Sequence, residues 1–598
     1  MGVHPDARKA IKGGEFLIRE TRAAEIFIPE DWNEEQRMIA QTCREFLEQE
    51  VDPKLDEIDS MKDPGLMPSI LDKAGALGLL GTSVPQEYGG FGMDFNTTML
   101  VSEIIGGGHS VAVALSAHTG IGTLPILYYG NEEQKKKYIP KLATGEWKAA
   151  YCLTEPDSGS DANSAKSKAV LSAEGSHYLI NGQKMWITNG GFADVFIVFA
   201  KIDDDKNLSA FIVERGFGGI TMNEEERKMG IKGSSTRQIF FNDCPVPAQN
   251  LLSERENGFK IAVNILNVGR IKLGAAAIGG SKRTVSIAVN YAIERKQFGT
   301  AIANFGAIKH KIAEMVTRLF ASESACYRAG QNIDDAYEAL VAGGMDTSQA
   351  RLKSLEEFAI ECAIMKVHGS EVLDFVVDEG VQIYGGMGFS AEGPMDRAYR
   401  DARINRIFEG TNEINRMLAL DMLLKRAMKG QLDLMTPAMA VQNELLSIPS
   451  MGEEADGLFA KEKKALANAK KAGLMIAGAA VQKFMMKLSE EQEIVMHLAD
   501  MLIEIYVAES CLLRVEKIMG EQGRELSPQF EMAMIYIHGA MEKIAAHGRE
   551  AIMAFAEGDE LRLMLLGLKR LSKIEPYNLK AARQIVAGYV IEKGKYPF

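Results

Sequence analysis

The sequence predicts a mainly α-helical protein with a β domain near its centre. Apolar residues recur at helical spacing from about Trp32 to Tyr138 and again from Gly258 onward. Between Lys148 and about Leu252 the pattern changes to short β-branched and aromatic runs separated by Gly, Asn, Asp and Pro, which are typical of strands and turns. With 598 residues the chain is also too long for one hydrophobic core, so several domains are expected.

The first two predicted domains cover residues 1–147 and 148–255. In the first, the helical pattern is interrupted at "LMPSI", "VPQEYGGFG" and "IIGGGHS". In the second, we expect strands in "HYLINGQKMWITNGG", "DVFIVFAKI", "LSAFIVE" and "RQIFFNDCPVP".

The third predicted domain, residues 256–430, is a bundle of long helices. One apolar stripe at helical spacing is formed by Ile308, Ile312, Met315, Val316, Leu319 and Phe320. A second helix is expected from about Thr347 to Gln382. A third should begin after Thr411, a good N-cap, and stop at Gly430.

The fourth predicted domain, residues 431–598, is again helical. A weak linker, "SIPSMGEEADG", is followed by a Lys- and Ala-rich segment over residues 458–487. As a helix this segment is basic at its start and apolar toward its end. Two interpretations stay open: the segment packs against the rest of the protein, or it lies on an anionic membrane surface.

Composition excludes several classes of protein. The net charge of −13 argues against nucleic acid as a main partner. The six cysteines have no C-x-x-C spacing and the histidines form no H-x-x-x-H pair, so neither a metal site nor a disulfide framework is expected. The N-terminus lacks the apolar stretch of a secretory signal, and no run approaches the ~18 apolar residues of a membrane-spanning helix. We therefore expect a cytoplasmic protein.

One carboxylate stands in an unusual place. In "RINRIFEGTNEINR", Glu409 follows Ile407 and Phe408 and precedes Gly410. A carboxylate just before the N-cap Thr411 would interact favourably with the helix dipole. On this window alone, helix capping is the favoured interpretation.

Motifs for several common enzyme classes are missing from the sequence. No G-x-G-x-x-G follows a strand, there is no P-loop, and no G-x-S-x-G occurs at a strand-to-helix turn. What remains is seven dispersed stretches rich in hydroxyls, amides and glycine. They are "YCLTEPDSGSD", "KMWITNGG", "KMGIKGSSTRQIFF", "ILNVGR", "ERKQFG", "QIYGGMGF" and "IFEGT". Each alone fits an ordinary turn, strand or helix end, but their joint occurrence in this order is hard to explain by chance.

Together these stretches resemble the acyl-CoA dehydrogenase family over roughly Trp32 to Lys429. The sequence "ILNVGR" and the added C-terminal region are most similar to the very-long-chain branch and its bacterial long-chain counterparts. The resemblance implies an N-terminal helical domain, a β-barrel or sandwich domain and a four-helix bundle, here with an additional C-terminal helical domain.

The resemblance also implies a reaction, the α,β-dehydrogenation of a fatty acyl-CoA. Glu409 would take the α-proton, and its backbone amide would donate to the thioester carbonyl. Two branches of the family carry the base directly before the arginine matched by Arg270, where this chain has Gly269. Arg270 is similar to the arginine that binds CoA, Asn267 stands where the medium-chain pattern has Asp, and Gly410 would let the backbone approach the substrate.

FAD is the cofactor that the resemblance implies. The stretch from Tyr151 to Ser160 would run along it, with Thr154 at the ring edge and Ser160 at the pyrophosphate and near the CoA arm. Trp186 would cover the isoalloxazine and Thr188 would reach N5. The remaining implied FAD contacts, first those expected from a neighbouring subunit and then those of the same chain, are Arg295, Gln297, Phe298, Gln382, Gly385, Gly386, Thr411 and Glu413.

The implied partners are an acyl-CoA substrate, electron-transfer flavoprotein and further copies of the chain, as a homodimer or homotetramer. An acyl-CoA oxidase and a non-catalytic helical scaffold of the same fold are the alternatives. In "SAHTGIGTLP", Gly120 and Gly122 would make room for a long acyl chain, although glycines in a helix break are also ordinary stops.

Overall fold

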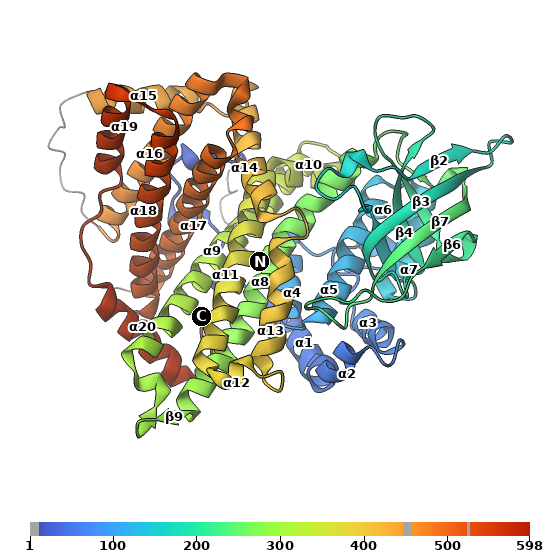
Figure 1. Ribbon diagram of the computed structural model, residues 1–598, viewed down its shortest axis with the longest axis horizontal. Coiled ribbons are helices and arrows are strands. Elements are labelled where there is room, and N and C mark those ends of the chain that lie inside the picture. Colours follow the sequence, from blue (N-terminus) through green and yellow to red (C-terminus); the bar gives the residue numbers. More distant parts are fainter. Residues whose placement is uncertain (1–10, 447–456, 523–526) are drawn as a thin grey trace.

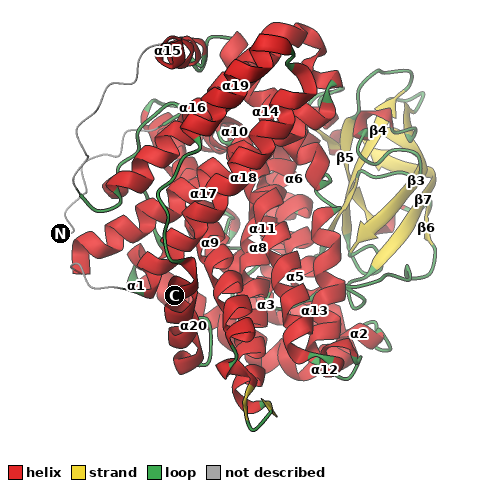
Figure 2. Ribbon diagram, turned by 60° about the vertical axis from the view of Figure 1, so that its left-hand side comes forward, coloured by secondary structure: helices red, strands yellow, loops and turns green. Residues whose placement is uncertain are grey.

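A computed structural model describes residues 11–446, 457–522 and 527–598 of the protein. The β domain lies at one end, the long bundle helices in the middle and the C-terminal helices at the other end (Figure 1). Figure 2 shows the same division, with the strands gathered at one side of the helices. The predicted fold class, mainly α with a central β domain and a C-terminal helical addition, is confirmed.

Short helices build the N-terminal region. They are α1 (Glu34–Phe46), α2 (Leu55–Ser60), α3 (Leu66–Ala76), α4 (Phe95–Gly106), α5 (Ser110–Ser116), α6 (Leu124–Tyr129) and α7 (Glu132–Thr144). The expected breaks at "VPQEYGGFG" and "IIGGGHS" are present, but the break at "LMPSI" is wrong. Pro68 lies in the first turn of α3, where its missing N–H would have had no helical partner anyway.

The β domain forms an eight-stranded sheet in the order β6-β7-β3-β2-β4-β5-β8, with β1 paired to β4. Its strands are β1 (Ala149–Cys152), β2 (Lys168–Leu171), β3 (His177–Thr188), β4 (Val195–Ile202), β5 (Ser209–Glu214), β6 (Ile220–Met222), β7 (Thr236–Pro247) and β8 (Leu251–Leu252). Strand β4 packs Phe196 and Val198 into the domain's own core and Ile197 and Phe199 into the main helical core. Burial on both faces explains its nearly continuous apolar sequence.

The bundle contains the longest helices. Its elements are α8 (Gly258–Glu294), β9 (Lys296–Gln297), β10 (Thr300–Ala301), α9 (Gly306–Ala342), α10 (Thr347–Glu357), α11 (Ala359–Tyr384), α12 (Gly386–Phe389), α13 (Pro394–Ala402) and α14 (Asn412–Met428). The single helix expected from Thr347 to Gln382 is divided at Phe358, whose φ and ψ are −102° and 25°. The Phe358 side chain is fully buried, so core packing favours the kink that no local signal predicted.

The C-terminal region is helical as expected. Its helices are α15 (Met435–Leu446), α16 (Ala460–Phe484), α17 (Gln492–Gln522), α18 (Pro528–Phe555), α19 (Gly558–Leu571) and α20 (Leu579–Lys593). Helix α16 packs against α15, α17, α18 and α19. The linker "SIPSMGEEADG" lies outside the described residues apart from Gly457, and the exact bounds of the four domains stay a prediction.

Two helical stretches, Ser110–Tyr129 and Gly258–Glu294, have the length and composition of a membrane span. The expectation that no such run exists is therefore wrong, because small apolar residues with few charges fill both stretches. The apolar window of each is mostly buried inside the protein, at 78% and 72%, as in core helices of other proteins.

Candidate functional site

Glu409 lies on the loop between α13 and α14 and faces α8. A Cβ atom built on Gly269 of α8 would come within 2.6 Å of Glu409 Oε2. Glycine at this position therefore provides the space that the carboxylate occupies. Glu409 and Gly410 both have positive φ, 58° and 79°. A non-glycine residue in this conformation is strained, and such strain is typical of functional loops.

Burial raises the pKa of Glu409 to about 7, against the opposing effect of the nearby cations of Arg270 and Lys366. Within the described residues, its buried Oε2 atom accepts no hydrogen bond. A carboxylate that is desolvated and left without donors is a stronger base than an exposed one.

Thr411 caps α14, as predicted. Its hydroxyl accepts a hydrogen bond from the Ile414 amide at 3.3 Å. At the other end, α14 finishes at Met428 and Gly430 follows with a φ of 69°. The capping interpretation of Glu409 is therefore unnecessary, because the cap is a hydroxyl and the carboxylate points at Gly269. Glu413 lies exposed in the first turn of the helix.

Arg270, one residue beyond Gly269, is buried beside the loop. Its Nε donates to the Glu409 carbonyl at 3.4 Å and its NH1 donates to Asn267 Oδ1 at 2.8 Å. Asn267 is itself buried and is not part of the cavity wall. In this structure Asn267 orients Arg270, and its predicted contact with CoA stays a prediction.

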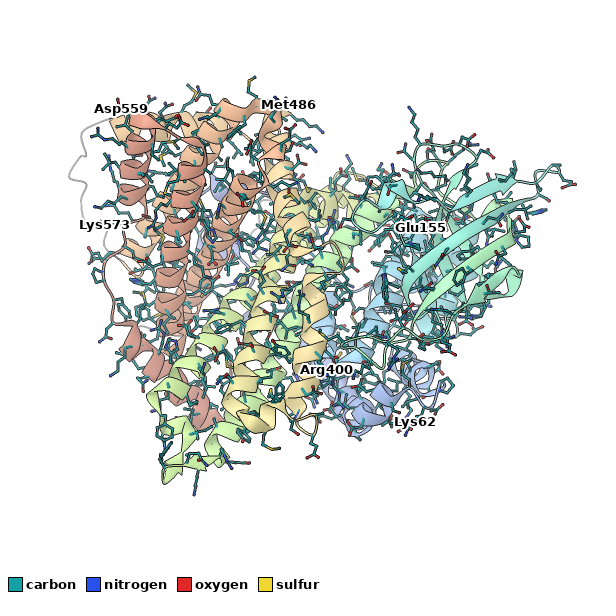
Figure 3. All side chains as sticks on the ribbon, in the orientation of Figure 1. Lys62, Glu155, Arg400, Met486, Asp559 and Lys573 are labelled. Carbon is teal, nitrogen blue, oxygen red and sulfur yellow. The ribbon has the colours of Figure 1, made fainter. Side chains whose placement is uncertain are left out.

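A cavity of about 400 Å³ extends from Glu409 toward the β domain and between α4, α8 and α13. Figure 3 labels Glu155, the neighbour of Thr154, in the β domain and Arg400 on α13. Seven of the predicted site residues line the cavity together with Glu409, namely Tyr151, Thr154, Ser160, Trp186, Thr188, Arg270 and Gly410. The structure thus brings together predicted site residues from two predicted domains, 148–255 and 256–430.

Two cavity residues have features that suit a bound planar group. The Tyr151 hydroxyl is buried without a hydrogen-bond partner among the described residues. Burial, and then the charge of Glu409, raises the pKa of Tyr151 well above its ordinary value, so the hydroxyl stays a donor. The Trp186 side chain is 53% exposed, and its φ is 60°. An aromatic ring held in strained backbone and left uncovered offers a face for stacking.

Six predicted cofactor residues lie away from this cavity, at the end of the molecule that carries β9 and α12 (Figure 1). They are Arg295, Gln297, Phe298, Gln382, Gly385 and Gly386. The end of α8 and the end of α11 are joined there by Tyr291 and Tyr384, whose stacked rings lie 3.9 Å apart. Phe298 is 96% exposed. Within one chain, then, these residues form a second group that does not reach Glu409.

Two residues around the loop were not predicted. Lys366 of α11 donates from Nζ to Asn412 Oδ1 at 2.7 Å, and burial lowers its pKa to about 8. Asn415 donates from Nδ2 to the carbonyls of Glu409, Gly410 and Thr411, at 3.4, 2.8 and 3.0 Å. The isolated lysine in the apolar run "AIECAIMKVHGS" was a usable signal, whereas nothing local distinguished Asn415.

Four family models match the chain. They describe the N-terminal domain (residues 33–146), the middle domain (150–244) and the C-terminal domain (256–424) of acyl-CoA dehydrogenases, and a second C-terminal domain of the same name (468–570). A probable acyl-CoA dehydrogenase of Bacillus subtilis is 46% identical over 98% of both chains. The mitochondrial very long-chain specific acyl-CoA dehydrogenase of Rattus norvegicus is 42% identical over 62% of this chain and 57% of its own.

A solved structure has the same overall fold. The acyl-CoA dehydrogenase of Bacillus anthracis, crystallised with FAD, superposes with a TM-score of 0.96 at 46% identity, covering 98% of this chain and 100% of that one. The agreement includes the C-terminal helices as well as the three domains that surround the cavity. The chain therefore belongs to the acyl-CoA dehydrogenase family.

Proposed function

We propose that this acyl-CoA dehydrogenase acts on long-chain fatty acyl-CoA, with Glu409 as the base that removes the α-proton. The position of the Glu409 carboxylate carries the proposal: it is desolvated against Gly269, has a pKa of about 7, and shares a cavity with Thr154, Trp186 and Thr188. A base of this pKa is half ionised near neutral pH, where general-base catalysis of a weak carbon acid is efficient.

FAD fits the cavity as the cofactor. Tyr151 offers an unpaired hydroxyl, Trp186 an exposed ring, and a Cβ at Gly159 would meet nothing within 4 Å. We assign Tyr151, Thr154, Ser160, Trp186 and Thr188 to binding it from this chain, together with Thr411 and Glu413 at the start of α14. When bound, FAD supplies the acceptor for the hydride that leaves Cβ of the acyl chain.

The chain's own residues would orient the thioester. The amide of Glu409 would donate to the thioester carbonyl, and one such donor is typically worth ~3–4 kcal/mol in the transition state. Arg270 would contact the CoA part from the cavity wall, and Ser160, which lines the same cavity and is exposed, would lie near the CoA arm. Gly410 lacks the side chain that would separate the loop from the substrate.

Cavity shape supports a long acyl chain. One face of α8 lines the cavity from Leu266 to Ile287, a length of about 30 Å at ~1.5 Å per residue. Small residues, Ala276 and Gly280, lie along this wall. Gly120 also lines the cavity, whereas Gly122 packs against β1 and does not, so only Gly120 supports the predicted role.

Two partners follow from the proposed reaction. The exposed group around Arg295, Phe298 and Gln382 would complete the FAD site of a neighbouring subunit, which makes the enzyme a homodimer or homotetramer. Electron-transfer flavoprotein would reoxidise the enzyme in the cytoplasm.

For the segment 458–487 we favour packing over membrane contact, because α16 is enclosed by four helices.

Anaerobic titration with acyl-CoA of increasing length, C4 to C20, tests the proposed function. Bleaching of the flavin absorbance by the long substrates is the expected result. The same titration under air separates the alternatives, because an oxidase would release peroxide with each turnover and a dehydrogenase would not. An enzyme that stays yellow with every acyl-CoA would contradict the proposal.

A further inference from the structure

Helix α14, which directly follows the Glu409 loop, is held on two sides by Arg416. Its NH1 and NH2 donate to the two carboxylate oxygens of Glu371 on α11, at 2.8 and 2.9 Å. Its Nε donates to Asp500 Oδ1 on α17, at 2.7 Å. The Arg416 side chain is only 12% exposed and that of Asp500 19%. Charge-assisted contacts that use both edges of a guanidinium fix its orientation as well as its position.

The same helix turn holds the loop. Asn415, next to Arg416, donates to the backbone carbonyls of Glu409 and Gly410. Asn412 donates to Glu371 Oε1 at 3.0 Å, so the Glu371 carboxylate accepts hydrogen bonds from both Asn412 and Arg416. The first turn of α14 therefore connects the loop to Glu371 and, through Arg416, to the C-terminal region.

We propose that Asp500, in the C-terminal helical region, is a positioning residue for Glu409. It acts through Arg416, which sets the first turn of α14 and with it the loop that carries the carboxylate. The inference rests on the proposed role of Glu409 as base. A loop with φ of 58° and 79° persists only when its surroundings over-determine it. The C-terminal region supplies one of these constraints from outside the bundle.

The charges around Asp500 are consistent with this role. Glu371 and Arg416 face it from α11 and α14, and His547 of α18 has its pKa lowered, mainly by burial, with Asp500 among the opposing charges. His497 of α17 lies beside His547, with their Nδ1 atoms 3.0 Å apart. Arg416 is the cation that contacts Asp500 directly among the described residues, so loss of the Asp500 carboxylate leaves Arg416 with Glu371 alone.

The test is Asp500→Ala in the full-length FAD-loaded enzyme, with single-turnover flavin reduction measured across pH. Loss of the Asp500 carboxylate should displace the Glu409 carboxylate by up to about one ångström, and such a displacement is expected to slow flavin reduction by about tenfold or more. It should also move the pH midpoint of the rate, because the distances from Glu409 to Arg270 and Lys366 change. Asp500→Asn retains an oxygen acceptor and should recover most of the rate.

Arg583→Ala is the matched control. Arg583 Nε donates to Glu314 Oε1 at 2.7 Å, and this contact also joins the C-terminal region to the bundle. The Arg583 side chain is 22% exposed and that of Glu314 14%. The Arg583→Ala substitution should lower Tm to a similar extent without changing the rate of flavin reduction or its pH midpoint. A wild-type rate and midpoint in Asp500→Ala would overturn the proposal, even if its Tm falls.

Arg416→Lys keeps the test decisive if Asp500→Ala does not fold. Lysine cannot contact Glu371 and Asp500 in the same way, so flavin reduction should slow, and a wild-type rate would overturn the proposal. Where both variants fold, the double variant should show a non-additive effect, because the two residues act through one contact. Bleaching of the wild-type enzyme by acyl-CoA tests the role of Glu409 separately.

Discussion

At the scale of single residues, the site depends on a carboxylate that the protein keeps out of water. Glu409 is half-buried, its Oε2 has no hydrogen-bond donor among the described residues, and Gly269 provides the space beside it. Each of these features disfavours the charged form, and Arg270 and Lys366 oppose them only in part. The result is a carboxylate whose protonation changes near neutral pH.

Glu409→Gln should abolish bleaching of the flavin by acyl-CoA while FAD stays bound. The change is nearly isosteric, but it removes the group that takes the α-proton, a loss commonly worth ~10²–10⁴-fold. In the wild type, the rate of flavin reduction should rise as the pH passes through about 7, because the ionised form is the base. Retention of more than a tenth of wild-type activity would exclude Glu409 as the base.

The same variant should change stability in a pH-dependent way. The folded pKa of about 7 lies above the ordinary value of 4.5, so the folded state binds this proton more tightly than the unfolded state. The stability that this tighter proton binding gives to the folded state is lost as pH rises from about 4.5 to about 7. Glu409→Gln, which has no charge, should therefore raise Tm relative to wild type at pH 8 and less so at pH 5.

Gly120→Phe should shift the preferred substrate from long to short acyl chains. A Cβ at Gly120 meets nothing within 4 Å, so the ring has room to enter the cavity and fill the space of the acyl chain. We expect kcat/KM for C16 substrate to fall by about tenfold or more relative to C4. Gly588→Phe is the control, since Gly588 is equally open but lies at an exposed position of α20, away from the cavity. An unchanged chain-length profile would place the acyl chain elsewhere.

At the scale of elements, the β9–β10 hairpin projects from the bundle with little support of its own. Arg295, Gln297 and Phe298 are all exposed there, and Phe298 and Gly299 have positive φ, 54° and 81°. Within the described chain, Arg295 makes no ion pair. A hairpin that exposes a guanidinium and an aromatic ring in this way suits a ligand shared with another subunit.

Arg295→Ala should weaken retention of FAD more than it changes the rate of the holoenzyme that remains. The physical reason is the loss of a charge-assisted contact to pyrophosphate. Flavin stoichiometry after gel filtration and dialysis measures the effect, with Lys296→Ala on the same hairpin as control. Full stoichiometry in Arg295→Ala would contradict the cross-subunit role.

Helix α16 is an example of an amphipathic segment whose partner is the protein itself. Its lysines pair with acidic residues of neighbouring elements: Lys463 with Glu516, Lys470 with Glu509 and Lys471 with Glu444. Lys470 and the apolar Leu474 and Ile476 are buried. Both the basic and the apolar part of the segment are thus used within the fold.

The intact protein should not co-sediment with anionic liposomes at low salt. Deletion of 458–487 would remove a packed helix, so the informative variant is Met485→Ser/Met486→Ser, whose side chains are 74% and 80% exposed in wild type. Met486 lies at the outer edge of the C-terminal region in Figure 3. Salt-sensitive binding that disappears in the double variant would instead establish a membrane contact at this edge.

At the scale of the whole molecule, a buried ion network joins the helical domains. Arg514 of α17, with a fully buried side chain, binds Glu30 near the N-terminus and Glu323 of α9. Glu323 also binds Lys282 of α8, whose Nζ lies 2.6 Å from Glu103 of α4. Removal of one member leaves the others desolvated and incompletely paired, which is more damaging than loss of an exposed pair.

Arg514→Ala should lower the free energy of unfolding by about 3–5 kcal/mol, the range for breaking a buried pair. Urea unfolding followed by circular dichroism measures the change. Lys461→Ala, which disrupts the exposed pair with Glu575, is the control and should change stability little. Equal effects of the two substitutions would show that the buried network does not stabilise the assembly of domains.

The sequence alone determined the order of helical and β regions and the cap at Thr411. These features are local: helical spacing, strand composition and capping residues act over a few positions along the chain. The candidate role of Glu409 came instead from the joint occurrence of seven stretches far apart in the sequence. Tertiary structure decided the rest. The kink at Phe358 follows from burial of its side chain in the core.

The environment of Glu409 likewise depends on packing. Arg270 contacts its carbonyl from 139 positions away, and Lys366 and Asp500 act through Asn412 and Arg416 on helices that meet only in the folded chain. No periodicity encodes these contacts, because they depend on which helix faces pack together. The sequence by itself therefore pointed to Glu409 as the candidate base, and the packing of α8, α11 and α17 around α14 decided the pKa and the orientation of its carboxylate.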